Sequence, residues 1–141
     1  MGDSDDYDIA GFLQRDGAIG LLTRLDTKEG KLVGEIEAEV HVSHTTFQER
    51  KDEALNLDLI ERVLSPDDHG NAKRYQLTRR GKTVLTEMKR KGVTDDYREF
   101  FDCYELLEEG KDELADWVQD EQITDPDWPY DPEPAHDYYE D

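Results

Sequence analysis

The sequence predicts an α+β fold with a core of three helices, a β-hairpin, and further helices towards the C-terminus. Three observations carry this prediction. Apolar residues recur at helical spacing over residues 16–25. Two short strand-like runs, 59–64 and 74–77, flank a segment dense in turn-forming residues. Ser43 and Thr78 each precede a helical pattern, and both are natural N-cap residues.

The N-terminal elements follow from composition and periodicity. The acidic residues 1–8 are expected to form a disordered arm. The first helix is expected over 16–25, with or without a short helical turn before it. A turn over 26–30 leads to a short edge strand at 31–33 and a short second helix over 34–39. The apolar residues expected to face inward here are Ala18, Leu21, Leu22, Leu25, Ile36 and Val40.

A third helix is expected to begin after Ser43 and to end near Asn56. The Ser43 hydroxyl can accept a hydrogen bond from the free N–H groups of the first turn. Phe47, Ala54 and Leu57 recur at helical spacing and would face the core.

The two strand-like runs are expected to pair as an antiparallel hairpin. Residues 65–71 between them are rich in turn formers, so the hairpin should have a long tip. Thr78 can then cap a fourth helix, in which Val84, Leu85 and Met88 are apolar and which ends at Gly92.

The last third of the chain is expected to be helical and then irregular. Apolar and aromatic residues recur at spacings of three and four over 94–119, and Gly110 is expected to break this pattern into two helices. Residues 122–141 are rich in proline and acids and are expected to form a disordered acidic tail. The expected organisation is therefore a domain over 9–92, an acidic amphipathic helical extension over 93–121, and the tail.

The net charge of −20 is unevenly distributed. Residues 1–8 carry −4 and residues 93–141 carry −17, whereas residues 9–92, with fifteen Lys/Arg and fourteen Asp/Glu, carry +1. Within 73–91, eight basic residues accompany one acid, Glu87. Such a local excess indicates an anionic partner or an acidic tail, and the alternative is a solvated helix face. The basic residues are Lys73, Arg74, Arg79, Arg80, Lys82, Lys89, Arg90 and Lys91.

Other functional classes find little support. The single cysteine, Cys103, cannot form an internal disulfide and is more simply a core residue than a redox sensor. The N-terminus does not resemble a secretory signal, and no apolar run is long enough for a membrane span, so a cytoplasmic protein is expected. His41 and His44 lack further metal ligands at suitable spacing, and no catalytic motif is evident. We therefore expect no metal, no cofactor and no enzymatic activity.

Two stretches in this order resemble the winged helix-turn-helix superfamily of DNA-binding domains, close to MarR-like and HxlR-like regulators. They are 42–47 leading to 57–62, and 74–82 with Leu85. The resemblance covers roughly residues 12–92. It implies that the third helix is a recognition helix, that the hairpin is the wing, and that the protein is a sequence-specific transcriptional regulator of double-stranded DNA, with repression as one mode.

The resemblance also implies which side chains would meet DNA. A recognition helix reads base edges from its first turns, while wing and flanking cations contact phosphates or the minor groove. Arg50 and Lys51 are better placed for the backbone than for bases. The expected DNA-binding residues are Ser43, His44, Thr45, Thr46, Gln48, Arg50, Lys51, Lys73, Arg74, Arg79 and Lys82.

Some positions depart from the family's pattern. Lys51 stands where an apolar residue is usual, and Asp58 stands where glycine is common. Glu49 would repel phosphate, unless it accepts a hydrogen bond from a cytosine amino group. The hallmark cysteine and tryptophan near the start of HxlR-like proteins are absent, so no subfamily is assigned.

An aromatic and apolar stripe in the helical extension predicts a homodimer, because winged-helix regulators often pair through terminal helices. The alternative is that the stripe packs on its own domain. The residues expected at the dimer contact are Phe100, Phe101, Tyr104, Leu107 and Trp117.

The acid excess has two interpretations. One is adaptation to high intracellular salt, as in halophilic archaea. The other is local: the tail covers the basic wing and mimics DNA. The second functional hypothesis is accordingly a protein-interaction module that reuses a winged helix, with its acidic aromatic tail binding a basic partner.

Overall fold

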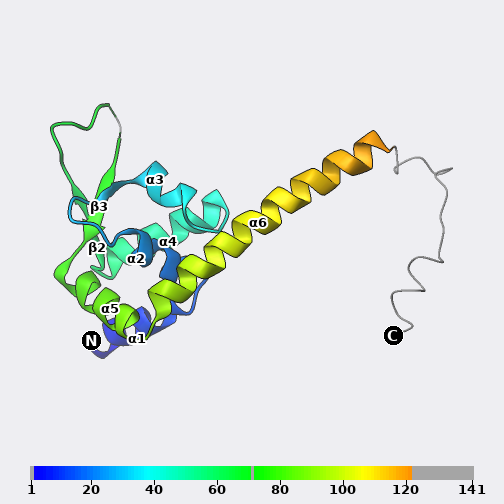
Figure 1. Ribbon diagram of the computed structural model, residues 1–141. Helices are drawn as coiled ribbons and strands as arrows, with labels where there is room; N and C mark the ends of the chain where they lie inside the picture. Colours follow the sequence, from blue (N-terminus) through cyan, green and yellow to red (C-terminus); the bar gives the residue numbers. More distant parts are fainter. Residues whose placement is uncertain (1, 71, 122–141) are drawn as a thin grey trace, which may run out of the picture. The chain divides into compact units, whose positions relative to one another are not determined.

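The computed structural model describes residues 2–70 and 72–121, with side chains from Asp8 onward (Figure 1). The chain divides into two compact units, 1–104 and 105–141, and each is described by itself. The first unit therefore extends beyond the expected domain boundary at residue 92. The expected tail over 122–141 lies outside the described residues.

The order of elements follows the sequence prediction closely. The helices are α1 Gly2–Leu13, α2 Ala18–Arg24, α3 Val33–Ala38, α4 His44–Asn56, α5 Arg79–Arg90 and α6 Val93–Asp120. The strands are β1 Lys31–Leu32, β2 Ile60–Val63 and β3 Arg74–Leu77.

The strands form one antiparallel sheet in the order β1-β3-β2. Ile60 pairs with Leu77 and Val63 with Arg74, and these pairs set the register of the hairpin. The edge strand β1 adds to the other side of β3, where Lys31 pairs with Tyr75. The predicted hairpin and the predicted edge strand are both confirmed.

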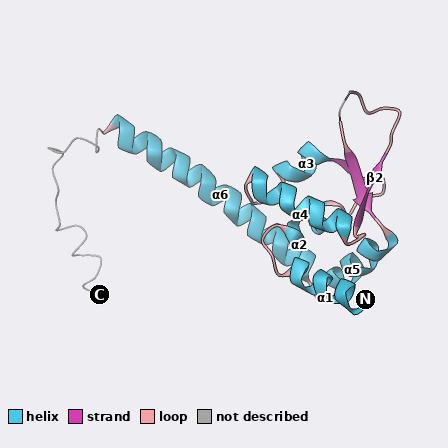
Figure 2. Cartoon of the chain, turned by 180° about the vertical axis from the view of Figure 1, so that it is seen from behind, coloured by secondary structure: helices cyan, strands magenta, loops and turns pink. Residues whose placement is uncertain are grey.

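Helix α2 lies at the centre of the core. Its predicted inward residues, with Leu25 directly after it, are at most 1% exposed. Phe12 of α1, Ile36 of α3 and Phe47 of α4 are equally buried and pack in the same cluster. Figure 2 shows α1, α2, α4 and α5 grouped beside the small sheet. The helices and the sheet thus share one hydrophobic core.

The link between α4 and β2 depends on a left-handed residue. Asp58 has φ 59°, the only positive φ at a described residue other than glycine. This conformation lets the Leu59 N–H donate to the Ala54 carbonyl at 2.9 Å, so the chain leaves the helix directly into the strand. The structure thus explains why glycine is common at this position, and aspartate tolerates the conformation better than most residues.

Three details differ from the sequence prediction. Residues 2–8 are helical in α1 instead of forming an arm, since Phe12, Ile9 and Leu13 anchor the same helix to the core. Helix α6 continues through Gly110, because one interior glycine costs only about 1 kcal/mol and its neighbours are good helix formers. Cys103 is exposed and is not a core residue, because it lies on the outer side of α6.

The first turns of α6 belong to the first unit. Tyr97 and Phe101 are buried at 6% and 7% exposure, so this part of the aromatic stripe packs on its own domain. In the second unit the stripe is exposed, between 48% and 66% of each side chain. The exposed residues there are Leu106, Leu107, Leu114 and Trp117. No helix among the described residues has the length and apolarity of a membrane span.

Candidate nucleic-acid interface

The N-terminus of α4 is open to solvent. Ser43 is its N-cap, with an extended backbone, and the Ser43 Oγ accepts from the Thr46 N–H at 3.2 Å. The same hydroxyl donates to Thr46 Oγ1 at 3.1 Å. Ser43, His44 and Thr45 are all exposed. The local sequence therefore builds a helix start that presents small polar side chains outward.

A pair across the helix-turn-helix supports this start. His44 Nδ1 lies 2.8 Å from Glu37 Oε2 on α3, and the His44 side chain remains 71% exposed. This contact joins α3 to the first turn of α4, so the two helices present a common surface.

Lys51 packs between α4 and the wing. Its side chain is only 11% exposed, and its Nζ lies 5.9 Å from the centre of the Tyr75 ring on β3. The Nζ donates a hydrogen bond to Gln48 Oε1 at 2.7 Å, so the Gln48 side chain is also bound within the protein. A long aliphatic stem can fill an apolar position while its charged end finds polar partners. This geometry accounts for a lysine at a position that is usually apolar.

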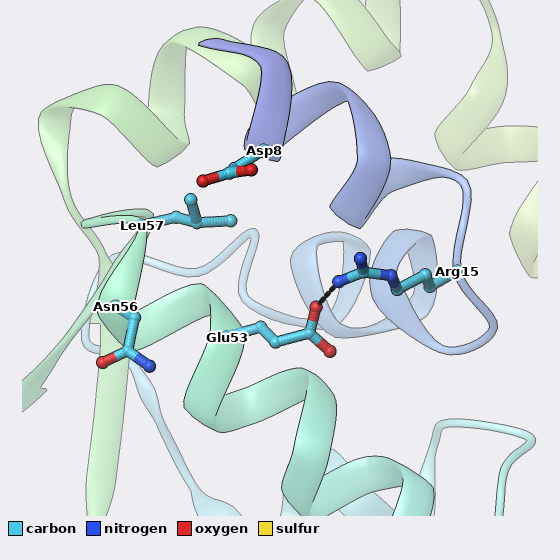
Figure 3. Close-up of a pocket in the computed structure, with 5 residues that line it drawn as sticks. All are labelled: Asp8, Arg15, Glu53, Asn56 and Leu57. Carbon is cyan, nitrogen blue, oxygen red and sulfur yellow. Dashed lines mark hydrogen bonds and ion pairs between the residues drawn. The ribbon is translucent and has the colours of Figure 1, made fainter. Parts of the chain in front are cut away.

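Arg50 is held by the protein itself. Its Nε donates to the Asp16 carbonyl at 2.9 Å, its guanidinium pairs with Glu53, and its side chain is 13% exposed. Glu53 also pairs with Arg15, beside a hollow of about 200 Å³ (Figure 3). Asp8, Asn56 and Leu57 complete the lining of this hollow. The Glu53 carboxylate thereby fastens α4 to the turn between α1 and α2.

These contacts give α4 an acidic outer face. Glu49 and Asp52 are 61% and 65% exposed, whereas the neighbouring cations, Arg50 and Lys51, are largely covered. Exposed carboxylates repel phosphate, so this helix has little general attraction for a DNA backbone.

The wing carries one outward and one inward cation from the expected set. Lys73 is exposed. Arg74 donates to both carboxylate oxygens of Asp68 at 3.0 and 3.1 Å and to the Gly30 carbonyl at 3.3 Å. The hydrogen bond from Arg74 lowers the pKa of Asp68 and raises the pKa of Arg74. Arg74 therefore secures the hairpin loop and the turn before β1.

Helix α5 presents basic residues but buries its cap. Thr78 Oγ1 accepts from the Gly81 N–H at 3.1 Å and donates to the Asp58 carbonyl at 2.5 Å. Arg79 and Lys82 in the first turn are exposed. Arg80 is also exposed, and it donates to the Leu57 carbonyl at 3.2 Å. The expected site residues did not include Arg80, although it directly follows Arg79 in the sequence.

The expected site residues thus fall into two groups. The outward-facing ones are Ser43, His44, Thr45, Lys73, Arg79 and Lys82. The others are half-buried or buried and contact protein groups: Thr46 with Ser43, Gln48 with Lys51, and Arg50 and Arg74 with carboxylates. His44 belongs to the first group because it stays 71% exposed while paired with Glu37. Arg62 of β2 is a further exposed cation of the hairpin, which was not among the expected site residues.

Comparison with known proteins gives a result at the level of fold. No protein-family model matches the chain, and no curated protein matches it. Solved structures do. A possible HxlR family transcriptional factor from Thermoplasma volcanium superposes with a TM-score of 0.50 at 18% identity, over 62% of this chain and 82% of that chain.

Two MarR regulators are similar to a comparable degree. One MarR family transcription regulator gives a TM-score of 0.51 at 21% identity, over 88% of this chain and 83% of its own. A MarR transcriptional regulator from Methanosarcina mazei gives 0.50 at 16% identity, over 77% of this chain and 79% of its own. The chain therefore has the winged-helix fold, with α3 and α4 as its helix-turn-helix and β2–β3 as its wing.

Proposed function

We propose that the protein is a sequence-specific regulator of transcription that binds double-stranded DNA in the cytoplasm. The observation that carries this proposal is the exposed start of α4, where Ser43, His44 and Thr45 face solvent on a winged-helix scaffold. Such a helix end can enter a major groove, and its free N–H groups favour a phosphate. His44 and Thr45 are the side chains we assign to base edges.

Backbone contacts are assigned to cations outside α4. Lys73 on the wing and Arg79 and Lys82 on α5 are exposed. Arg50, Lys51 and Arg74 are left out of the proposed contacts, because their side chains are only 13%, 11% and 20% exposed and bind the protein's own groups. With about three phosphate contacts, the logarithm of the affinity should fall with the logarithm of salt concentration at a slope of about −3.

The acid excess fits a high-salt interior, and we propose that the protein comes from a halophilic organism. Phosphate attraction is largely screened at molar salt, where the Debye length is about 3 Å. Base contacts and shape fit would then determine binding. An acidic outer face on α4 does little harm under these conditions, since repulsion is screened as well.

We further propose a homodimer. Leu107 and Trp117, with Leu106 and Leu114, form a large exposed apolar set in the second unit. Clusters of this kind are typical of protein interfaces. Phe101 and Tyr104 are withdrawn from the proposed contact, because Phe101 is buried in the first unit and Tyr104 is half-buried there against His41 and Phe101, whereas Phe100 is 46% exposed. Sedimentation at low and high salt would test this, since self-repulsion of the acidic helix should weaken pairing at low salt.

The DNA assignment is tested with Thr45→Ala in the full chain, measured by mobility shift on the protein's own upstream DNA at high salt. One lost base contact is worth about 1–3 kcal/mol, so specific affinity should fall roughly fivefold or more. The matched control is Thr86→Ala, an exposed threonine on α5 whose hydroxyl donates to the Lys82 carbonyl. Unchanged affinity and site preference in the Thr45 variant would show that α4 is not the reader.

A second candidate function has one observation in its favour. The exposed Glu49 and Asp52 suit a basic protein partner better than a nucleic acid. A protein-interaction module would bind no DNA sequence selectively, and Glu49→Gln with Asp52→Asn would weaken capture of the basic partner. The same double variant should strengthen DNA binding at low salt under the leading proposal, so the two functions predict opposite changes.

A further inference from the structure

Tyr97 of α6 meets the turn that precedes the recognition helix. Its hydroxyl accepts from the His41 backbone N–H at 3.3 Å and lies 3.1 Å from His41 Nδ1. The Tyr97 side chain is buried at 6% exposure. His41 is two residues before Ser43, the cap of α4, so this contact lies at the base of the surface proposed to read DNA.

We propose that Tyr97 is a positioning residue for DNA recognition, whose hydroxyl fixes the turn at His41 and thereby the start of α4 relative to the first turns of α6. The proposal rests on the DNA-binding function proposed above. Under this proposal α6 has two roles: it forms the dimer contact, and it positions the recognition helix α4.

The Tyr97 ring is itself held from two sides, so its hydroxyl is a fixed point. On α2, a Cβ at Gly20 would lie only 2.4 Å from the Tyr97 hydroxyl, which shows how closely the two helices approach. The Arg24 guanidinium lies 5.5 Å from the centre of the Tyr97 ring and 4.8 Å from that of Phe101. Arg24 Nε also donates to the Glu39 carbonyl at 2.9 Å, which ties α2 and α6 to the end of α3.

The turn has a further contact with α6 and one with the segment before α2. The His41 ring packs edge-on against Phe100, with ring centres 4.6 Å apart. The neighbouring Val42 lies against Gly17, where an added Cβ would be 3.1 Å from Val42 Cγ2. With both residues of the turn in contact, movement of the first turns of α6 reaches Ser43 through two residues of chain.

The hydroxyl satisfies both of its hydrogen-bonding roles only when His41 is neutral. With the ring hydrogen on Nε2, the hydroxyl accepts from the backbone N–H and donates to Nδ1. A protonated imidazole carries a hydrogen on Nδ1 as well, so Nδ1–H would donate to the hydroxyl and the Tyr97 O–H would lose its acceptor. Burial lowers the pKa of His41, which favours the neutral ring, and the nearby charge of Asp16 partly opposes this.

Other ionisable groups around this contact are few among the described residues. Tyr97 and Tyr104 contribute from α6, Arg24 from α2, and Asp16 from the turn before α2. From α3, Glu37 and Glu39 are engaged by His44 and Lys31. His41 is therefore the group in direct contact with the Tyr97 hydroxyl that is expected to change charge in mildly acidic solution.

The test compares Tyr97→Phe with Tyr104→Phe in the full chain. Both keep the aromatic ring, and Tyr104 also lies against His41 at 6.1 Å, but its hydroxyl bonds to no other described residue. Losing a hydrogen bond of ordinary strength should weaken specific DNA binding about fivefold in Tyr97→Phe. Tyr104→Phe should bind as the wild type does.

Two readouts separate positioning from a loss of stability. Amide exchange at His41 and in the first turn of α4 should accelerate in Tyr97→Phe and not in Tyr104→Phe. In addition, wild-type DNA affinity should fall as the pH drops below the ordinary pKa of histidine, about 6.5. That fall should be shallower in Tyr97→Phe, because the hydrogen bond from the Tyr97 O–H to Nδ1, which protonation reverses, is already absent.

The outcomes are distinguishable. Faster exchange with weaker DNA binding supports the proposal. Faster exchange with unchanged DNA binding, or equal effects in both variants, overturns the positioning role while DNA binding stands. A wild type that binds no DNA overturns the proposed function, and the positioning role with it.

Discussion

Helices α4 and α5 begin with the same kind of N-cap, but the N-terminus of α4 is exposed and that of α5 is buried. Each starts after a hydroxyl cap that accepts from the N–H three residues later, Ser43 in one case and Thr78 in the other. Ser43 is exposed, whereas Thr78 is 7% exposed and also donates to the Asp58 carbonyl. A cap motif alone thus indicates where a helix starts, but it does not indicate whether that N-terminus is accessible to a ligand.

The two helices also differ in the charges that they expose to solvent. On α4 the cations are turned inward and carboxylates face solvent, while on α5 the first turn exposes Arg79, Arg80 and Lys82. The open helix end is therefore not the basic one. We infer a division of labour in which α4 reads bases and the wing with α5 holds phosphates, and four experiments can break or sharpen it.

The largest effect is expected at Gly81 in the first turn of α5. A Cβ there would lie 2.0 Å from the Leu59 carbonyl oxygen, a backbone atom that cannot move aside. Gly81→Ala should destabilise the protein by about 2–3 kcal/mol in urea unfolding. Gly110→Ala on α6 is the matched control, since no atom lies within 4 Å of its added Cβ, and it should stabilise by up to about 1 kcal/mol. Equal stability of the two variants would contradict the buried start of α5.

The caps themselves provide the second test. Thr78→Ala removes a buried cap and should cost about 1–2 kcal/mol, whereas Ser43→Ala removes an exposed one and should cost about 0.5–1 kcal/mol. DNA affinity should show the opposite ranking, with a loss for Ser43→Ala and none for Thr78→Ala at temperatures where both are folded. Greater DNA loss in the Thr78 variant would reverse the assignment of the two helix ends.

Lys51 tests whether the inward cations of α4 are structural. Lys51→Met keeps the aliphatic stem against Tyr75, so stability should change by less than about 1 kcal/mol, and DNA affinity should stay within about twofold. Lys73→Glu on the exposed wing should weaken binding to all sequences alike. If Lys51→Met weakened DNA binding as strongly as Lys73→Glu, Lys51 would be a phosphate contact after all.

The smallest effect concerns the wing's ion pair. Arg74 lowers the pKa of Asp68, so the carboxylate form is favoured in the folded protein. The stability from this pair is fully present above the ordinary aspartate pKa of about 4 and is lost as the pH falls through the lower folded value. Titration of the Asp68 carboxyl by NMR should show this depression, and Arg74→Gln should abolish it. A normal Asp68 pKa in the wild type would mean that the pair does not hold the hairpin loop.

Much of the fold was predictable because its signals are local. The Ser43 and Thr78 caps, the alternation that buries Tyr75 and Leu77, and the left-handed turn at Asp58 each depend on a few neighbouring residues. Gly110 was misjudged for a related reason: its local signal is real but weak, and the helix formers on both sides outweigh it.

The hydrogen-bond partners of the long side chains were not predictable from local sequence. Arg50 reaches the carbonyl of Asp16, and Arg74 reaches Asp68 and Gly30, so each cation is neutralised by a partner that only folding brings near. Spacing along a helix shows which side a residue occupies, but a flexible side chain turns towards whichever acceptor the tertiary structure places within reach.

The sequence by itself therefore determined the order of elements from α2 to α5, the caps and most of the inward residues of the core, because periodicity and cap chemistry act over a few residues. Only the tertiary structure decided which helix start is open, which cations face solvent, and that Tyr97 lies beneath the turn at His41. Those outcomes depend on contacts between residues far apart in the chain, and such contacts form only when the core assembles.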